Sequence, residues 1–235
     1  MALFLLGVIV FVGLLLAIPL VSNAPALTRA LDRAHGVAYP GPAVPERFAA
    51  ALAAAKDQGP GLETGGSPVS AAGVLIDGLT GRAGPGGSTL SQQLARILYG
   101  PGRSGTLARA EVVLLGIKLG LSYPAAKILQ MYADVAYFGH GYYGLAAASC
   151  GYFAVPPARL SWAQAAVLAD LVLAPSAAGP SSAQARAAEA RVLARLTATG
   201  RLSQAQAAQA YRQPLYITNR SAAHGRAAKC PRAVG

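Results

Sequence analysis

The spacing of apolar residues along this chain is that of helices, and it predicts an all-α protein. Apolar side chains recur every three or four positions, Pro and Gly clusters separate these stretches, and no run alternates as a half-buried strand would. Two Ser-x-x-Gln capping boxes, at Ser161 and Ser203, mark helix starts. The expected helices run from Pro45 to about Asp57, from Thr106 to about Leu119, from Pro124 through Tyr132, over 163–173, from Ser182 to Gly200, and onward from Ser203.

One further helix is expected between the glycine bend Gly86-Gly87 and the stop signal Gly100-Pro101, with Ser88 as its N-cap. One side of it carries an apolar row. The opposite face carries polar side chains and a cation: Ser88, Thr89, Gln92, Gln93 and Arg96. Such a face beside free N–H groups suits a phosphate or pyrophosphate. An ordinary capped amphipathic helix with a polar outer face has the same pattern.

Residues 2–22 are almost wholly apolar and long enough to span a bilayer, and the first charge is Arg29. We expect an uncleaved transmembrane anchor over 1–22, with a cleaved signal peptide as the alternative. A Pro- and Gly-bearing juxtamembrane link over 23–43, a folded domain over 44–212 and a basic tail over 213–235 follow. Within the domain, residues 58–87 are expected to form an irregular loop.

The charge balance favours anionic partners. Only 12% of the 235 residues are charged, yet the formal net charge is +11, which favours anionic lipid head groups or pyrophosphates. Nucleic acid is not an expected partner, because no basic helix with interleaved aromatics is present. The two cysteines, Cys150 and Cys230, leave a disulfide and two unrelated thiols equally open. Asp170, inside an apolar helix, is expected to have a structural partner.

The string GGSTLSQQLARILY, from Gly86 to Tyr99, closely resembles the GGST…QQL signature of family 51 glycosyltransferases, the transglycosylase domain of penicillin-binding proteins. Four further stretches are similar to motifs of that family, so the likeness covers nearly all of 44–212. They are Glu111–Leu119, Ala126–Gly139, Gly141–Ala148 and Leu160–Pro175. The chain ends where a bifunctional protein would continue into a transpeptidase, so it resembles the monofunctional type.

The resemblance implies a lysozyme-like helical fold, and polymerisation of lipid II through β-1,4 bonds with release of polyprenyl pyrophosphate. It also implies a single-pass protein of the bacterial cytoplasmic membrane with its domain outside. The positive-inside rule, applied to Arg29 and Arg33, gives the opposite orientation. Partners implied are the membrane and a transpeptidase or other cell-wall proteins. In the family, one glutamate acts as general base, and a second, with basic residues and sometimes a divalent cation (Mg or Mn), supports the pyrophosphate.

The chain departs from the family at the general base, where the motif position holds Lys56. A lysine is protonated at neutral pH and accepts no proton unless its pKa is strongly lowered. Asp57 matches the motif, and Glu63 stands where the family has a histidine. Three interpretations remain: an inactive domain, a substitute base at Asp57 or Glu63, or an alignment shifted by several residues.

The pyrophosphate-binding motifs are better preserved. Glu111 matches the second glutamate, Arg109 is what remains of a basic pair, and Arg96 replaces a lysine with a guanidinium that suits phosphate. The substrate-binding candidates are Gly87, Ser88, Thr89, Gln92, Gln93, Arg96 and Arg109. The leading hypothesis is a peptidoglycan glycosyltransferase of reduced activity, and the alternative is an inactive module that binds lipid II or cell wall. A glycan-cleaving enzyme is a weaker third.

Overall fold

The computed structural model describes residues 20–56, 90–102, 104–175 and 180–218, together with Gly13 and Cys230. Within these residues the structure consists of helices joined by turns and loops. The predicted all-α class is confirmed, since the β-type pairing within this part of the chain is a single bridge between Tyr137 and Tyr143. The elements are η1 (Val21–Asn23), α2 (Ala24–Ala34), α3 (Glu46–Lys56), α5 (Leu90–Tyr99), α6 (Thr106–Ser122), α7 (Ala125–Val135), α8 (Leu145–Phe153), η2 (Pro157–Arg159), α9 (Trp162–Leu173), α10 (Ser182–Ala198) and α11 (Gln204–Arg212).

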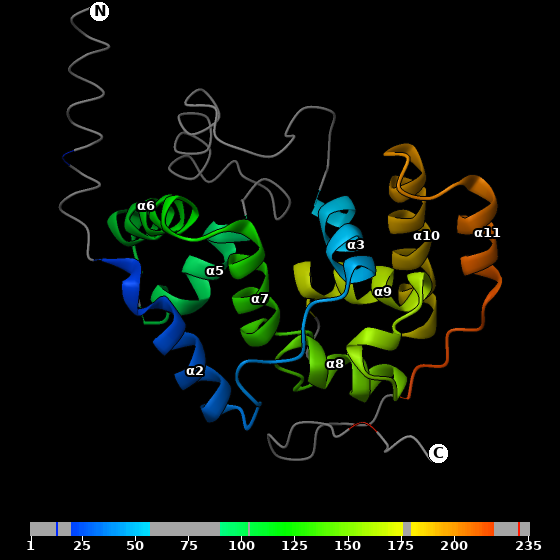
Figure 1. Cartoon of the computed structure of the whole chain (residues 1–235), viewed down its shortest axis with the longest axis horizontal. Coiled ribbons are helices and arrows are strands. Elements are labelled where there is room, and N and C mark those ends of the chain that lie inside the picture. The colour runs from blue at the N-terminus through cyan, green and yellow to red at the C-terminus, as the bar shows by residue number, and fades with distance from the viewer. Residues whose placement is uncertain are drawn as a thin grey trace, which may run out of the picture.

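The helices form two groups, which lie on the left and right of Figure 1. Helix α5 packs on α6 and α7, and α2 packs on α7. In the other group α9 lies between α3, α8, α10 and α11. Helix α9 is mostly apolar and mostly buried, as expected of a helix that packs against several others. Helix α8 contacts both α7 and α9 and so joins the two groups.

Three capping boxes begin the last three helices. The predicted boxes at Ser161 and Ser203 are confirmed, with the serine side chain accepting from the N3 backbone and the N3 glutamine returning to the serine N–H. Ser181 makes the same motif at α10, so Ser182 is the first helical residue. At α6 the N-cap is Gly105 and the helix begins at Thr106. At α7 Pro124 is the N-cap and the helix begins at Ala125, one residue later than expected.

Helix α2 lies inside the segment that we expected to be a link. Its buried positions, Ala24, Thr28 and Asp32, follow one another at four-residue spacing. Because two of the three are polar, the buried face shows no apolar stripe in the sequence. Two tyrosine hydroxyls hold the preceding turn: Tyr99 donates to Asn23 Oδ1 (2.8 Å) and Tyr123 donates to the main-chain oxygen of Val21 (3.0 Å).

The predicted anchor over 1–22 falls almost entirely outside the described residues, as does the expected loop over 58–87. Within the described residues, no helix combines the length and the apolar composition that crossing a bilayer requires.

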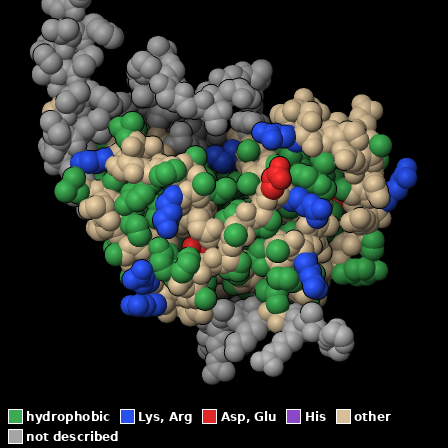
Figure 2. All heavy atoms as spheres, viewed as in Figure 1, with side chains coloured by type: hydrophobic (Ala, Val, Ile, Leu, Met, Phe, Trp, Pro, Cys, Tyr) green, Lys and Arg blue, Asp and Glu red, His purple; other side chains and the backbone are tan. Residues whose placement is uncertain are grey.

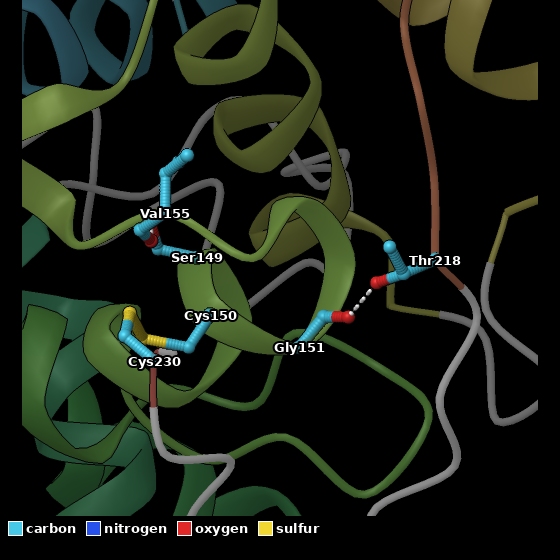
Figure 3. Close-up of a disulfide and its surroundings, with 6 residues drawn as sticks. All are labelled: Ser149, Cys150, Gly151, Val155, Thr218 and Cys230. Carbon is cyan, nitrogen blue, oxygen red and sulfur yellow. Dashed lines mark hydrogen bonds between the residues drawn. A yellow bond between two sulfur atoms is a disulfide. The ribbon is translucent and has the colours of Figure 1, made fainter. Parts of the chain in front are cut away.

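The two cysteines form a disulfide, Cys150–Cys230, which ties residue 230 to α8 (Figure 3). Of the two alternatives that the sequence left open, the structure has the disulfide. Residue Thr218 reaches the same helix, since its N–H donates to Tyr152 O (2.8 Å) and its hydroxyl donates to Gly151 O (2.5 Å). The segment that follows α11 is therefore fastened to α8 at two places.

Candidate functional site

The predicted polar face of α5 is divided between the protein interior and the solvent. Gln92 is only 6% exposed and faces α6. A Cβ added to Gly116 would lie 2.7 Å from both Cα and Cγ of Gln92, so the absence of a side chain at Gly116 lets the two helices approach this closely. The expectation of an outer face that includes Gln92 is therefore wrong, because a tertiary contact covers that position.

Gln93 and Arg96 lie on the accessible side of the same helix. Arg96 is exposed and Gln93 is half-buried. The Gln93 side-chain oxygen Oε1 is buried and has no hydrogen-bond partner among the described residues. Buried polar oxygens normally find a donor, so this oxygen has unused capacity for a ligand.

Helix α6 supplies two other residues for which the family resemblance implies a role in pyrophosphate binding. After the short connection over 100–105, Arg109 and Glu111 stand in its first two turns, Arg109 exposed and Glu111 half-buried. Since α5 and α6 make the most extensive helix pairing of the described fold, the structure brings four of the predicted residues onto one helix pair. These four, Gln93, Arg96, Arg109 and Glu111, are called here the α5–α6 site.

Lys56 belongs to the other helix group, at the last position of α3. It is half-buried. A second cation meets the same helix end: Nη1 of Arg195, on α10, donates to the main-chain oxygens of Ala55 (2.8 Å) and Ala54 (3.5 Å). Cations are favoured at a helix C-terminus, where free carbonyls carry partial negative charge. Nothing in the sequence pattern pointed to Arg195, because it lies about 140 residues away in the chain.

The remaining candidates, Asp57, Glu63, Gly87, Ser88 and Thr89, lie outside the described residues. The described residues bring no three His, Cys, Asp or Glu side chains together as ligands for a divalent cation.

Asp170 has the structural partner that we expected. Nη2 of Arg191 donates to both carboxylate oxygens of Asp170, at 3.1 and 3.0 Å. This pair lies on the outer side of the α9–α10 contact and plays no part in the α5–α6 site.

Comparison with known proteins matches the model of the transglycosylase family to residues 27–197. Penicillin-binding protein 1A of Aquifex aeolicus is 34% identical over 178 residues, which is 74% of this chain and 24% of that protein. Penicillin-binding protein 1F of Bacillus subtilis is 39% identical over 107 residues, 46% of this chain and 15% of that protein. The biosynthetic peptidoglycan transglycosylase of Alcanivorax borkumensis is 38% identical over 96 residues, 41% of this chain and 39% of that protein. The matched parts are thus well under half the length of each relative.

Proposed function

Since the chain belongs to the transglycosylase family, we propose that it acts on lipid II as a peptidoglycan glycosyltransferase domain with a lysozyme-like fold. The observation that carries the proposal is the α5–α6 site. Its exposed guanidinium, Arg96, stands one turn from the half-buried Gln93 on the accessible side of α5. Arg109 adds a second exposed cation. An exposed guanidinium suits a pyrophosphate, because it can donate two parallel hydrogen bonds to phosphate oxygens.

The proposed reaction joins disaccharides by β-1,4 bonds. A sugar hydroxyl loses its proton and attacks the anomeric carbon of the donor, and the C–O bond to polyprenyl pyrophosphate breaks. The α5–α6 site would stabilise the negative charge that develops on the leaving pyrophosphate. The hydroxyl proton needs an acceptor within hydrogen-bond reach, and the side chains available near position 56 in the sequence are Asp57 and Glu63.

A second candidate function is lipid II or cell-wall binding without turnover. The observation that favours it is the end of α3, where Lys56, predicted at the base position, is the last residue and Arg195 donates to Ala55. Two cations at this helix end make a poor proton acceptor, while they leave the α5–α6 site unchanged.

We also propose that the domain lies at the outer face of a bacterial membrane, attached through residues 1–22. Three exposed leucines support this: Leu107 and Leu121 on α6, and Leu20 beside η1, which packs on α6. Basic side chains are spread over the face seen in Figure 2 and acidic ones are few, which suits anionic lipid. The disulfide suits an oxidising compartment outside the cytoplasm. A transpeptidase would be the partner that cross-links the product.

The test measures glycan-chain formation from labelled lipid II in detergent, with lipid II binding on the same sample. The variants are wild type, Lys56→Glu and, as a matched charge reversal at another helix end, Arg212→Glu. Polymerisation by wild type supports turnover. The variants Asp57→Asn and Glu63→Gln would then identify the residue that accepts the proton. Binding without polymerisation, with activity gained in Lys56→Glu alone, supports the binding module. A folded wild type that neither binds nor polymerises lipid II overturns both.

A further inference from the structure

Two buried aspartates stand on α2 and α7, which pack against each other. Asp32 on α2 is 1% exposed and Asp134 on α7 is 5% exposed. Each has one buried carboxyl oxygen, Oδ2, without a hydrogen-bond partner in the described part of the chain. Two ionised carboxylates in this position would repel each other and leave both oxygens unsatisfied in a medium of low dielectric constant.

The other oxygen of Asp134 is fully engaged. Its Oδ1 accepts from Nε2 of Gln130 (2.8 Å) and from the backbone N–H of Gly41. Gln130 also contacts the segment over 41–44: its Nε2 donates to Pro42 O (3.2 Å), and its Oε1 accepts from the N–H of Val44 (3.3 Å). The pair therefore lies at the junction of three parts: α2, α7 and the segment over 41–44 that leads into α3.

Few charges act on this pair. Helix α2 carries Arg29 and Arg33, and His35 follows it as the C-cap. Helix α7 and the helices that pack on α2 or α7 carry the other titratable groups: Lys127 and Tyr132 on α7, Arg96 and Tyr99 on α5, Arg109, Glu111 and Lys118 on α6, and Tyr152 on α8. Among the described residues, Asp134 is the one charge that shifts the pKa of Asp32, and Lys127 is the one that shifts the pKa of Asp134. Lys127 is exposed, so the surroundings offer no buried cation to balance two negative charges.

We propose that Asp32 and Asp134 hold one proton between them in the folded protein, and that this proton closes the junction of α2, α7 and the segment over 41–44. A protonated carboxyl group donates one hydrogen bond and an ionised one accepts it, so a single proton would satisfy both Oδ2 atoms. This inference concerns the scaffold and is independent of lipid II turnover.

The electrostatics of the site agree with this arrangement. Burial, and then the charge of Asp134, raise the pKa of Asp32 to about 7, and burial raises the pKa of Asp134 as well. Because the folded pKa of Asp32 exceeds the unfolded one, its contribution to stability is complete at acidic pH. That contribution is lost as the pH rises through about 7.

The first test measures equilibrium unfolding of the full chain by urea, in detergent, from pH 5 to pH 8.5. The variants are Asp32→Asn, Asp134→Asn and a control, Asp170→Asn, which removes a carboxylate from an exposed ion pair. Relative to Asp32→Asn, the unfolding equilibrium constant of wild type should rise by up to about tenfold per pH unit between pH 5 and 7, the slope of one proton. Asp170→Asn should follow wild type, and Asp134→Asn should shift the change to lower pH because its amide donates in place of the proton.

The second test detects the proton directly. Infrared spectra of wild type should show the carbonyl stretch of a protonated carboxyl group at pH 6. This band should be weaker at pH 8.5, and the part that comes from the aspartate pair should be absent from Asp32→Asn. Glu189, another buried carboxyl group with a raised pKa, is common to all variants and cancels in the difference. Identical pH profiles for wild type and Asp32→Asn would overturn the proposal. So would stabilisation of wild type by Ca²⁺ at pH 8 that a chelator reverses, since a cation would then occupy the pair. If Asp32→Asn does not fold, the unfolding profile of Asp134→Asn and the pH dependence of the wild-type infrared band test the proposal instead.

Discussion

Arg195 fastens α10 to the end of α3, because its Nη1 lies 2.8 Å from the main-chain oxygen of Ala55. The next residue is Lys56, which the family resemblance predicts at the motif position of the general base. Helix α10 thus helps to fix the C-terminal end of α3, where the predicted base position is. The contact is half-buried, so its hydrogen bond is partly protected from competing water.

Replacing Arg195 with methionine should lower the free energy of unfolding by about 1–3 kcal/mol, because the charge-assisted hydrogen bond to Ala55 is lost while the apolar stem is kept. Urea unfolding measures this. Arg191→Met is the control, because the Arg191–Asp170 ion pair is largely exposed and should contribute about 1 kcal/mol or less. Equal losses in the two variants would mean that the Arg195 contact does not hold α3.

Removing the Arg96 guanidinium should weaken lipid II binding. Hydrogen bonds to a charged group contribute about 1.5–3 kcal/mol, so Arg96→Ala should raise the dissociation constant by roughly ten- to a hundredfold. Because Arg96 is exposed, the thermal midpoint should stay within about 2 °C of wild type. Arg33→Ala on α2 removes an equally exposed cation outside the α5–α6 site and should bind as wild type does. Weakening by the same factor in both would indicate a general charge effect.

Adding one methyl group at Gly116 should force α5 and α6 apart. The Cβ would meet Gln92 Cα at 2.7 Å, and backbone atoms cannot rotate away, so Gly116→Ala should destabilise the fold by about 1–3 kcal/mol. Gly120→Ala, one turn along the same helix, places its Cβ 3.4 Å from the Ser91 hydroxyl. It should be neutral or stabilise by up to about 1 kcal/mol through helix propensity. Calorimetry or urea unfolding gives the free energy of unfolding of both variants. A Gly116→Ala protein as stable as wild type would contradict the close approach of α5 and α6.

Opening the disulfide should destabilise the domain. Cys150 and Cys230 are separated by 80 residues, and cross-links over loops of this length typically stabilise by about 2–5 kcal/mol. Unfolding midpoints measured with and without reductant should therefore differ in wild type. The double variant Cys150→Ala/Cys230→Ala should have the unfolding midpoint of reduced wild type, and reductant should not change it. A wild-type midpoint that does not respond to complete reduction would contradict the expectation.

Local signals in the sequence predicted much of the fold. Ser161 and Ser203 begin helices because a capping box is satisfied by residues three apart, and no distant contact is needed. The stop at Gly100 and the length of α9 follow from equally local patterns. Helix α2 was missed because its buried face presents Thr28 and Asp32 to the interior, where an apolar stripe was the expected signal.

The site was predicted less completely, since it depends on contacts between distant segments. The pattern placed Gln92 on a solvent-facing side, but Gly116, 24 positions later, lets α6 cover it. Arg195 and the Asp32–Asp134 pair left no periodic signal, because each acts through a partner about 100 or more residues away. Two cysteines alone likewise could not decide between a bridge and free thiols.

The disulfide also makes residues 150–230 a closed covalent ring that contains α9, α10 and α11. A protease that cuts once anywhere inside that ring releases no fragment, because the two new ends stay joined through sulfur. The ring contains α9 and α10, which pack on α3. A molecule cut once inside the ring therefore keeps these helices covalently attached to the rest of the domain. If the domain lies outside the cytoplasm, as we propose, a single cut in this ring would leave both parts of the chain covalently joined.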